Sequence, residues 1–129
     1  MANPNIVSVA TILGGNAGWN LSTGLTTELL SVTAEYVVKI NRIVCTNVHA
    51  TDAANLSLYV GGMGSGTTGV SVTGGDATVY LAKVISVPAN ASLVVLDTPI
   101  YLMEADTLNG GSSAASSLDL FITYETLID

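Results

Sequence analysis

The residues of this sequence that could carry out chemistry are few and far apart. His49 is the only histidine, and Asp52 follows it within a run of small, turn-forming residues. A metal site would need further carboxylate or thiolate ligands at suitable spacing. A catalytic serine for the histidine to activate would need a Gly-x-Ser-x-Gly turn, which the sequence lacks. We therefore expect His49 and Asp52 to form a solvated turn.

Other candidates for chemistry are equally weak. Asp97 and Asp106 flank a short predicted strand and could pair, but both occupy turn positions in which aspartate caps the local backbone. Cys45 is the only cysteine, which excludes an intrachain disulfide, and its mid-strand position favours a small buried side chain over a reactive thiol. The glycine-rich segment 61–76 would need a following helix and a lysine to bind phosphate, and a strand follows instead. The sequence therefore predicts no enzyme, no cofactor and no metal site.

The elements that would position these residues are strands, and the central pattern spans residues 36–60. Two runs rich in β-branched and aromatic residues flank a polar break, which is typical of two antiparallel strands joined by a short loop. In the first run we expect one face to hold Val38, Ile40, Val44 and Val48, and the other to hold Val37, Lys39, Asn41 and Asn47. In the second run, Leu56, Leu58 and Val60 repeat the apolar alternation.

Further strands are expected on both sides of this pair. Their predicted ranges are Ile6–Leu13, Thr26–Thr33, Ala77–Val87, Ser92–Leu96, Ile100–Met103 and Ser117–Thr126, with a short helical turn as the alternative for the second. In the last, Leu118, Leu120, Ile122 and Tyr124 share one face. Residues 14–20 and 109–117 are expected to be loops, and 61–76 a flexible loop or a weak hairpin around residues 70–72. About eight strands without a helix predict one antiparallel β-sandwich over residues 1–129, of jelly-roll or Greek-key type, with a short extended N-terminal arm.

The composition points to a protein that is covered by other proteins. Charged residues make up only 10%, against about 25% in typical domains, and fifteen Thr and twelve Ser take their place. The alternative is a Ser/Thr-rich domain that stays monomeric. The net charge of −7 arises from ten acids against Lys39, Arg42 and Lys83, which argues against nucleic-acid binding and against anionic membranes. The sequence has neither a signal-peptide pattern nor a membrane-spanning run, so we expect the chain to be made and folded in a cytosol.

Several segments resemble a family of small virion proteins of tailed bacteriophages, especially marine and cyanobacterial ones. The segments that carry the resemblance are residues 1–12, 38–44, 46–48, 52–55, 85–93, 99–106 and 124–125. The resemblance implies a β-sandwich present in many copies and attached to a capsid or tail. It provides no catalytic residues.

The resemblance and the composition together predict a capsid decoration protein. It would lie outside the shell as a trimer or other small cyclic oligomer and bridge subunits of the major capsid protein, after synthesis in the host cytoplasm. Predicted contact residues are Asn3, Pro4 and Asn5 in the arm, Met63 in the glycine-rich loop, and Trp19, which could instead plug one end of its own sandwich. The alternatives are a tail, neck or fibre-associated protein and a carbohydrate-binding module for host attachment.

Overall fold

The chain forms two antiparallel sheets that pack face to face. The structure is a computed structural model, and it describes residues 11–64 and 71–128. Its strands are β1 (Thr11–Asn20), β2 (Glu28–Ser31), β3 (Tyr36–Asn47), β4 (Ala54–Gly61), β5 (Val79–Val87), β6 (Ser92–Leu96), β7 (Ile100–Leu102), β8 (Thr107–Ser112) and β9 (Leu118–Ile128). Within the described residues, no helix has the length and apolar character needed to cross a membrane.

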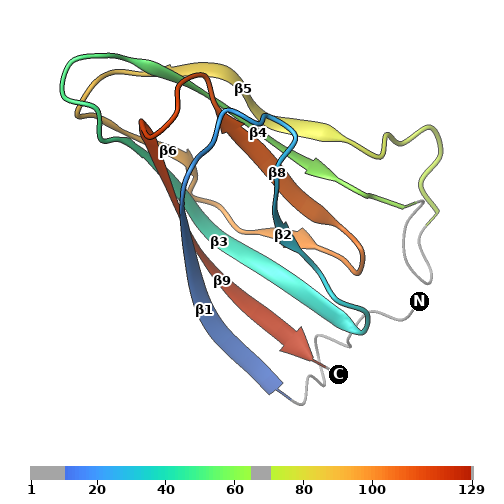
Figure 1. Cartoon of the computed structure of the whole chain (residues 1–129). Helices are drawn as coiled ribbons and strands as arrows, with labels where there is room; N and C mark the ends of the chain where they lie inside the picture. Colours follow the sequence, from blue (N-terminus) through green and yellow to red (C-terminus); the bar gives the residue numbers. More distant parts are fainter. Residues whose placement is uncertain (1–10, 65–70, 129) are drawn as a thin grey trace.

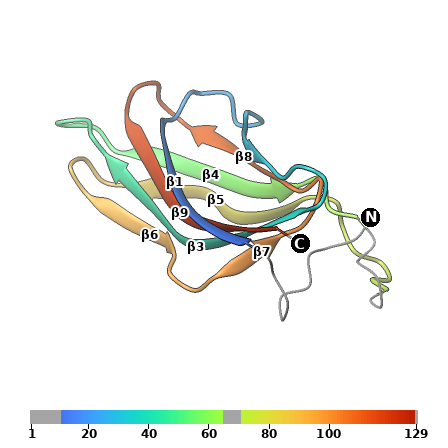
Figure 2. The same cartoon turned by 90° about the horizontal axis from the view of Figure 1, so that it is seen from below.

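The order of the strands is that of a jelly roll. One sheet has the order β1-β9-β3-β6, with β7 also paired to β3, and the other has the order β2-β8-β4-β5 (Figures 1 and 2). β6 and β7 pair with successive parts of β3, so they act as one strand interrupted around Pro99. With these two counted as one, eight strands pass back and forth between the sheets, which is the double Greek key of a jelly roll. The predicted β-sandwich is confirmed, and of its two predicted types the strand order selects the jelly roll.

The core lies between the inner faces of the two sheets. Its largest fully buried side chains include Ile40, Ile43, Leu56, Leu58, Leu108, Leu120 and Ile122. The expected inward faces of β4 and β9 are confirmed, with Tyr124 half-buried against the core. Each fully buried aliphatic side chain of this size stabilises the fold by about 1.5–3 kcal/mol relative to exposure.

The predicted face of β3 is wrong beyond Ile40. The pairing with β9 shifts register between Ile40 and Arg42, which makes Asn41 the extra residue of a β-bulge. One extra residue inverts the alternation, so Ile43, Cys45 and Asn47 are buried while Val44 is only half-buried and Val48 is exposed. The alternation in the sequence could not locate this bulge, because apolar residues occur there at both odd-numbered and even-numbered positions.

Residues 14–20 form a strand, not the expected loop. They belong to β1, which pairs with β9 at ten consecutive positions without a register shift. Glycine suits this strand because a side chain at Gly15 would lie within 2.7 Å of the Tyr124 ring. Pairing with β9 therefore holds this segment in the extended conformation, although its glycines alone would leave it flexible.

Residues 109–112 are also strand, so the expected loop at 109–117 is shorter than predicted. β8 is an inner strand of its sheet, held between β2 and β4. At Gly110 a Cβ atom would overlap the carbonyl oxygen of Ser57 in β4. A close approach of two backbones therefore requires glycine at this position.

The remaining predicted strands differ from those of the structure mainly in where they begin and end. The range 26–33 contains the four-residue strand β2 and no helical turn, while the predicted strand at 92–96 matches β6. Of the first predicted strand, residues 6–10 lie outside the described residues and 11–13 belong to β1. The arm with Asn3, Pro4 and Asn5, and the centre of the glycine-rich segment, also lie outside. The described residues of that segment after Gly61 are not in strands, and neither are residues 71–72 of the proposed hairpin.

Candidate interaction surfaces

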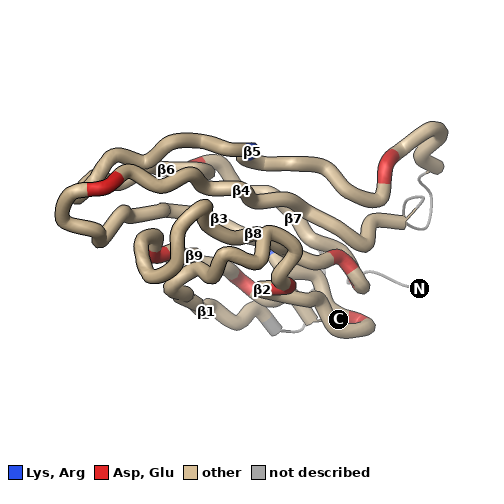
Figure 3. The backbone as a smooth tube through the Cα atoms, turned by 45° about the horizontal axis from the view of Figure 1, so that its top comes forward, with Lys and Arg blue, Asp and Glu red and all other residues tan. Residues whose placement is uncertain are grey.

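His49 and Asp52 do come together, and they form a turn. The imidazole Nε2 lies 3.8 Å from the Asp52 carboxylate, and Nδ1 accepts hydrogen bonds from the backbone N–H groups of Thr51 and Asp52 at 3.2 and 3.0 Å. The buried Asn47 amide donates to the carbonyls of Asp52 and Val87 at 3.0 and 2.9 Å and ties the turn to β5. Among the described residues, no three His, Cys, Asp or Glu side chains gather closely enough to hold a metal ion. The acids lie at separate places along the chain (Figure 3).

Cys45 is fully buried in the core, as expected for a small apolar side chain. Burial raises the pKa of its thiol from 9.0 to about 11, and the nearby Asp119 carboxylate adds to the shift. The thiolate is the reactive form of cysteine. The geometry therefore keeps this thiol protonated and out of contact with reagents.

Trp19 lies half-buried in β1 and packs against the core. It is paired with Leu120 of β9. Together with Gly18, Asn20, Asp119 and Phe121, these two residues line a shallow hollow of about 370 Å³. Of the two roles predicted for Trp19, its position favours the plug of the sandwich, and contact with another subunit stays a prediction.

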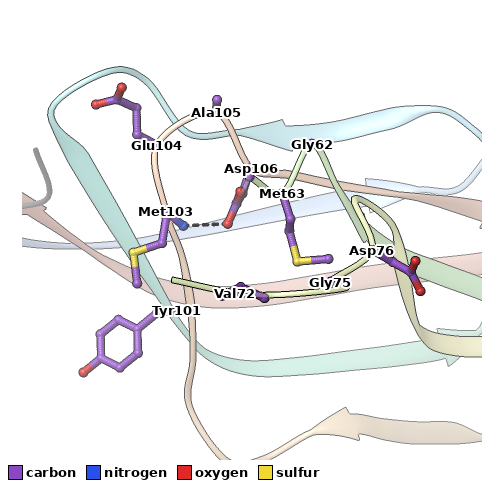
Figure 4. Close-up of a pocket in the computed structure, with 11 residues that line it drawn as sticks. Gly62, Met63, Val72, Gly75, Asp76, Tyr101, Met103, Glu104, Ala105 and Asp106 are labelled. Carbon is purple, nitrogen blue, oxygen red and sulfur yellow. Dashed lines mark hydrogen bonds between the residues drawn. The ribbon is translucent and has the colours of Figure 1, made fainter. Parts of the chain in front are cut away.

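Met63 lies in a groove at one end of the sandwich. The groove has a volume of about 410 Å³ and runs between residues 62–64 and 72–76 on one side and residues 101–106 on the other. The Met63 side chain is half-buried and points into this space (Figure 4). A second hollow of about 240 Å³, lined by Val79, Leu81 and Ile100, shares Met63, Tyr101 and Asp106 with it. The residues that line the two hollows include three acids and no lysine or arginine. Together the two hollows therefore suit a partner that presents an apolar side chain next to a positively charged one.

Asp106 is the buried acid of this groove. Its carboxylate Oδ2 accepts a hydrogen bond from the Met103 N–H at 2.9 Å, and its backbone carbonyl accepts one from the Val32 N–H at 3.0 Å. Burial raises the pKa of Asp106, while the Met103 hydrogen bond lowers it. The carboxyl therefore caps the turn after β7, as the sequence predicts for aspartate there. Asp97 is exposed at the other end of β7 and accepts a hydrogen bond from the Thr98 hydroxyl.

A row of apolar side chains crosses the outer face of the β1-β9-β3-β6 sheet. Phe121 of β9 lies opposite Val44 of β3, and Val44 lies opposite Val94 of β6. Phe121 and Val94 are each nearly half exposed. This row was not predicted from the sequence, although the alternation in β9 leaves Phe121 on the face opposite Leu120 and Ile122.

The other sheet exposes an aromatic pair. The ring centroids of Tyr59 and Tyr80 lie 5.3 Å apart, and the Lys83 ammonium nitrogen lies 5.1 Å from the centroid of the Tyr80 ring. Both tyrosines are in strands, as predicted, and Tyr80 is 47% exposed. A partly exposed aromatic pair of this kind can contact a protein side chain or the face of a sugar ring.

No protein-family model and no curated protein sequence matches the chain. Two solved structures with a similar arrangement are the VP2 subviral particle of infectious bursal disease virus and the Gt strain of that virus. The first has 16% identity and a TM-score of 0.37 over 94% of this chain and 33% of that one. The second has 13% identity and a TM-score of 0.32 over 94% of this chain and 34% of that one. The chain thus spans about a third of their length, and at these values the likeness bears on neither family nor function.

Proposed function

We propose that this chain is a structural component of a virus particle, a decoration protein that binds the outside of a tailed-bacteriophage capsid as a homo-oligomer. The observation that carries the proposal is the nature of its surface. Both sheets expose large apolar side chains, among them Phe121, Val94, Val84 and Tyr80, and charged residues make up only 10% of the whole chain. Such a surface suits a protein that is covered by other subunits.

Two further points support the proposal. The jelly roll is a common architecture of viral capsid proteins, although lectins and cupins share it, so the fold makes the role possible without selecting it. The segments that resemble phage virion proteins include the 38–44 part of β3, the turn between β5 and β6, and the corner between β7 and β8. These positions shape the sandwich and hold no chemistry, which suits a mechanical role.

The role would be to add contact area where capsid subunits meet. Each square ångström of apolar surface buried between proteins contributes about 25 cal/mol before the costs of association. Many copies on one lattice make weak contacts collectively strong. The negative charge suits a position outside the shell, since packaged DNA would repel it.

Cryo-electron microscopy of purified particles from the source phage tests the proposal. We expect density for this sandwich across the capsid lattice. Density at the neck or along the tail would refute the capsid location and support the tail, neck or fibre alternative, and absence from the particle would refute the virion role. A matched functional test heats particles with and without the protein and measures DNA release, which we expect at a lower temperature without it.

Carbohydrate binding is a second candidate function, and the partly exposed Tyr59–Tyr80 pair is the observation that favours it. Aromatic platforms beside polar groups are suited to stacking against sugars. A glycan array is the first test, with the Tyr80→Ser variant as a probe of the platform. Binding by the wild type that Tyr80→Ser abolishes would establish this alternative, and an array without binding would remove it.

A further inference from the structure

Each sheet of the sandwich has two edges, and three of the four edges are poorly suited to pairing with another strand. β5 shifts register twice against β4 and carries Lys83 and the positive-φ residue Val84. β2 is four residues long and has a bulge. The β6 and β7 edge is broken into strands of five and three residues by the segment around Pro99. Bulges, charges, proline and short length are the usual means by which edge strands avoid pairing.

The fourth edge, β1, has none of these features. It is ten residues long and keeps one register with β9 from end to end. Its sequence, TILGGNAGWN, has no charge and no proline. Within the described residues β1 pairs only with β9, and it borders its sheet in Figure 1. Alternate residues of an antiparallel strand direct their N–H and C=O groups to each side, so about half of these backbone groups point away from β9.

We propose that β1 is a homotypic interface, at which β1 of a second copy pairs with it in the antiparallel direction about a two-fold axis. Charge favours a second copy as the occupant. The chain as a whole has a net charge of −7 and would repel itself, but β1 carries no charge, so two copies can meet there without like charges facing each other. Self-association through β1 does not depend on where the protein is located.

The side chains of β1 complement themselves in this arrangement. Ile12 and Leu13 at its start are 60% and 51% exposed, and its end carries the half-buried Ala17 and Trp19. Antiparallel pairing places the apolar start of each strand beside the Ala17–Trp19 end of the other. In an antiparallel pair, two opposite residues direct their backbone groups either both towards each other or both away, so the two-fold axis passes through a residue and not between two. The residues nearest the centre of β1 are Gly15 and Asn16.

The oligomeric state of the full chain tests the interface. By sedimentation equilibrium across the micromolar range, we expect a dimer with about twice the 13.1 kDa chain mass. A Gly14→Lys variant, whose side chain meets open space within its own subunit, should dissociate, with a dissociation constant raised roughly tenfold or more because edge lysines block pairing. Gly64→Lys is the matched control, since its side chain also meets open space and lies outside β1. It should remain dimeric.

A crosslinking experiment locates the pairing directly. If the axis passes through Asn16, the Asn16→Cys variant should oxidise to a covalent dimer; if it passes through Gly15, a mixture of Gly14→Cys and Asn16→Cys chains should do so. Opposite Cα atoms lie about 4.5–5.5 Å apart, within disulfide range, and the buried Cys45 does not compete. A monomeric wild type, or a trimer insensitive to Gly14→Lys, would overturn the interface without affecting the proposed virion role. Both lysine variants should show the same cooperative thermal unfolding transition as the wild type, which would exclude loss of the fold as the cause of dissociation.

Discussion

Replacing Gly110 by alanine is a direct test of how β8 is packed. The alanine Cβ would overlap the Ser57 carbonyl oxygen and lie 2.9 Å from the Cα of Leu58. Both are backbone atoms of β4, and β4 is itself held between β8 and β5. The contact therefore cannot be relieved by turning a side chain, and one of the two strands must move.

The cost follows from that displacement. Overpacking costs about 1–3 kcal/mol, and each ladder hydrogen bond that is weakened adds roughly 0.5–1.5 kcal/mol. With one or two such bonds lost, Gly110→Ala should reduce the free energy of unfolding by about 1.5–6 kcal/mol. Typical domains have only about 5–15 kcal/mol in total, so the variant should lose a large part of its stability.

Urea unfolding followed by the fluorescence of Trp19 is a suitable assay, because this is the only tryptophan and it packs against the core. Gly18→Ala in β1 is the matched control, since its Cβ would make an ordinary contact, 3.6 Å from the Leu120 carbonyl oxygen. We expect the control to lie within about 0.5 kcal/mol of the wild type. Equal unfolding midpoints for the two variants would refute the pairing of β8 with β4.

Three further predictions concern single side chains. Burial raises the pKa of Asp106, so its ionised form disfavours folding and its protonated form does not. As the pH falls from about 8 towards 4, the free energy of unfolding of the wild type should therefore rise relative to that of Asp106→Asn. Urea midpoints of both proteins across this range would test the prediction, and a difference that stays constant with pH would contradict it. The Cys45 thiol, with a pKa of about 11, should react with a thiol reagent only when the chain unfolds, so labelling at the same rate with and without urea would contradict its burial. Trp19→Ala should cost about 2 kcal/mol of stability if the ring plugs the sandwich, since full burial would cost 3–5; an unchanged urea midpoint would favour an interface role instead.

The sequence patterns predicted strands well where side-chain alternation decides the structure. In β4 and β9 the apolar positions repeat every second residue, and the predicted inward faces are the buried ones. In β3 the prediction fails after Ile40. Apolar residues occur there at both odd-numbered and even-numbered positions, and the bulge at Asn41 decides which of them point inward. A bulge is set by pairing with β9, more than seventy positions along the chain.

The two strands mistaken for loops have a common cause. Gly14, Gly15 and Gly18 in β1, and Gly110 and Gly111 in β8, are residues that locally favour turns. In the folded chain Gly15, Gly110 and Gly111 occupy places where a neighbouring ring or backbone comes too close for a side chain. Gly14 and Gly18 have room for one, and their strand is ordered by pairing with β9. Tertiary contacts therefore override the local preference, and the local sequence gives no sign of those contacts.

The candidate surfaces were only partly predictable for a similar reason. The sequence drew attention to Trp19 and Met63 as unusual residue types, and the structure places one beside the core and the other in a groove. The Phe121–Val44–Val94 row and the β1 edge depend on strand order and register. Neither can be deduced before the strands are assigned to sheets.

The position of β9 sets the order of events during synthesis. The first described strand, β1, and the third, β3, are joined in one sheet only through β9, whose residues 118–128 are made after all the other strands. Because translation adds about 5–20 residues per second, β1 must wait several seconds with both of its edges unpaired before its sheet can close. The sandwich can therefore close only after β9 has been made, and its folding is dominated by distant contacts, which makes it slow. Chaperones that shield exposed strands would act on β1 until then.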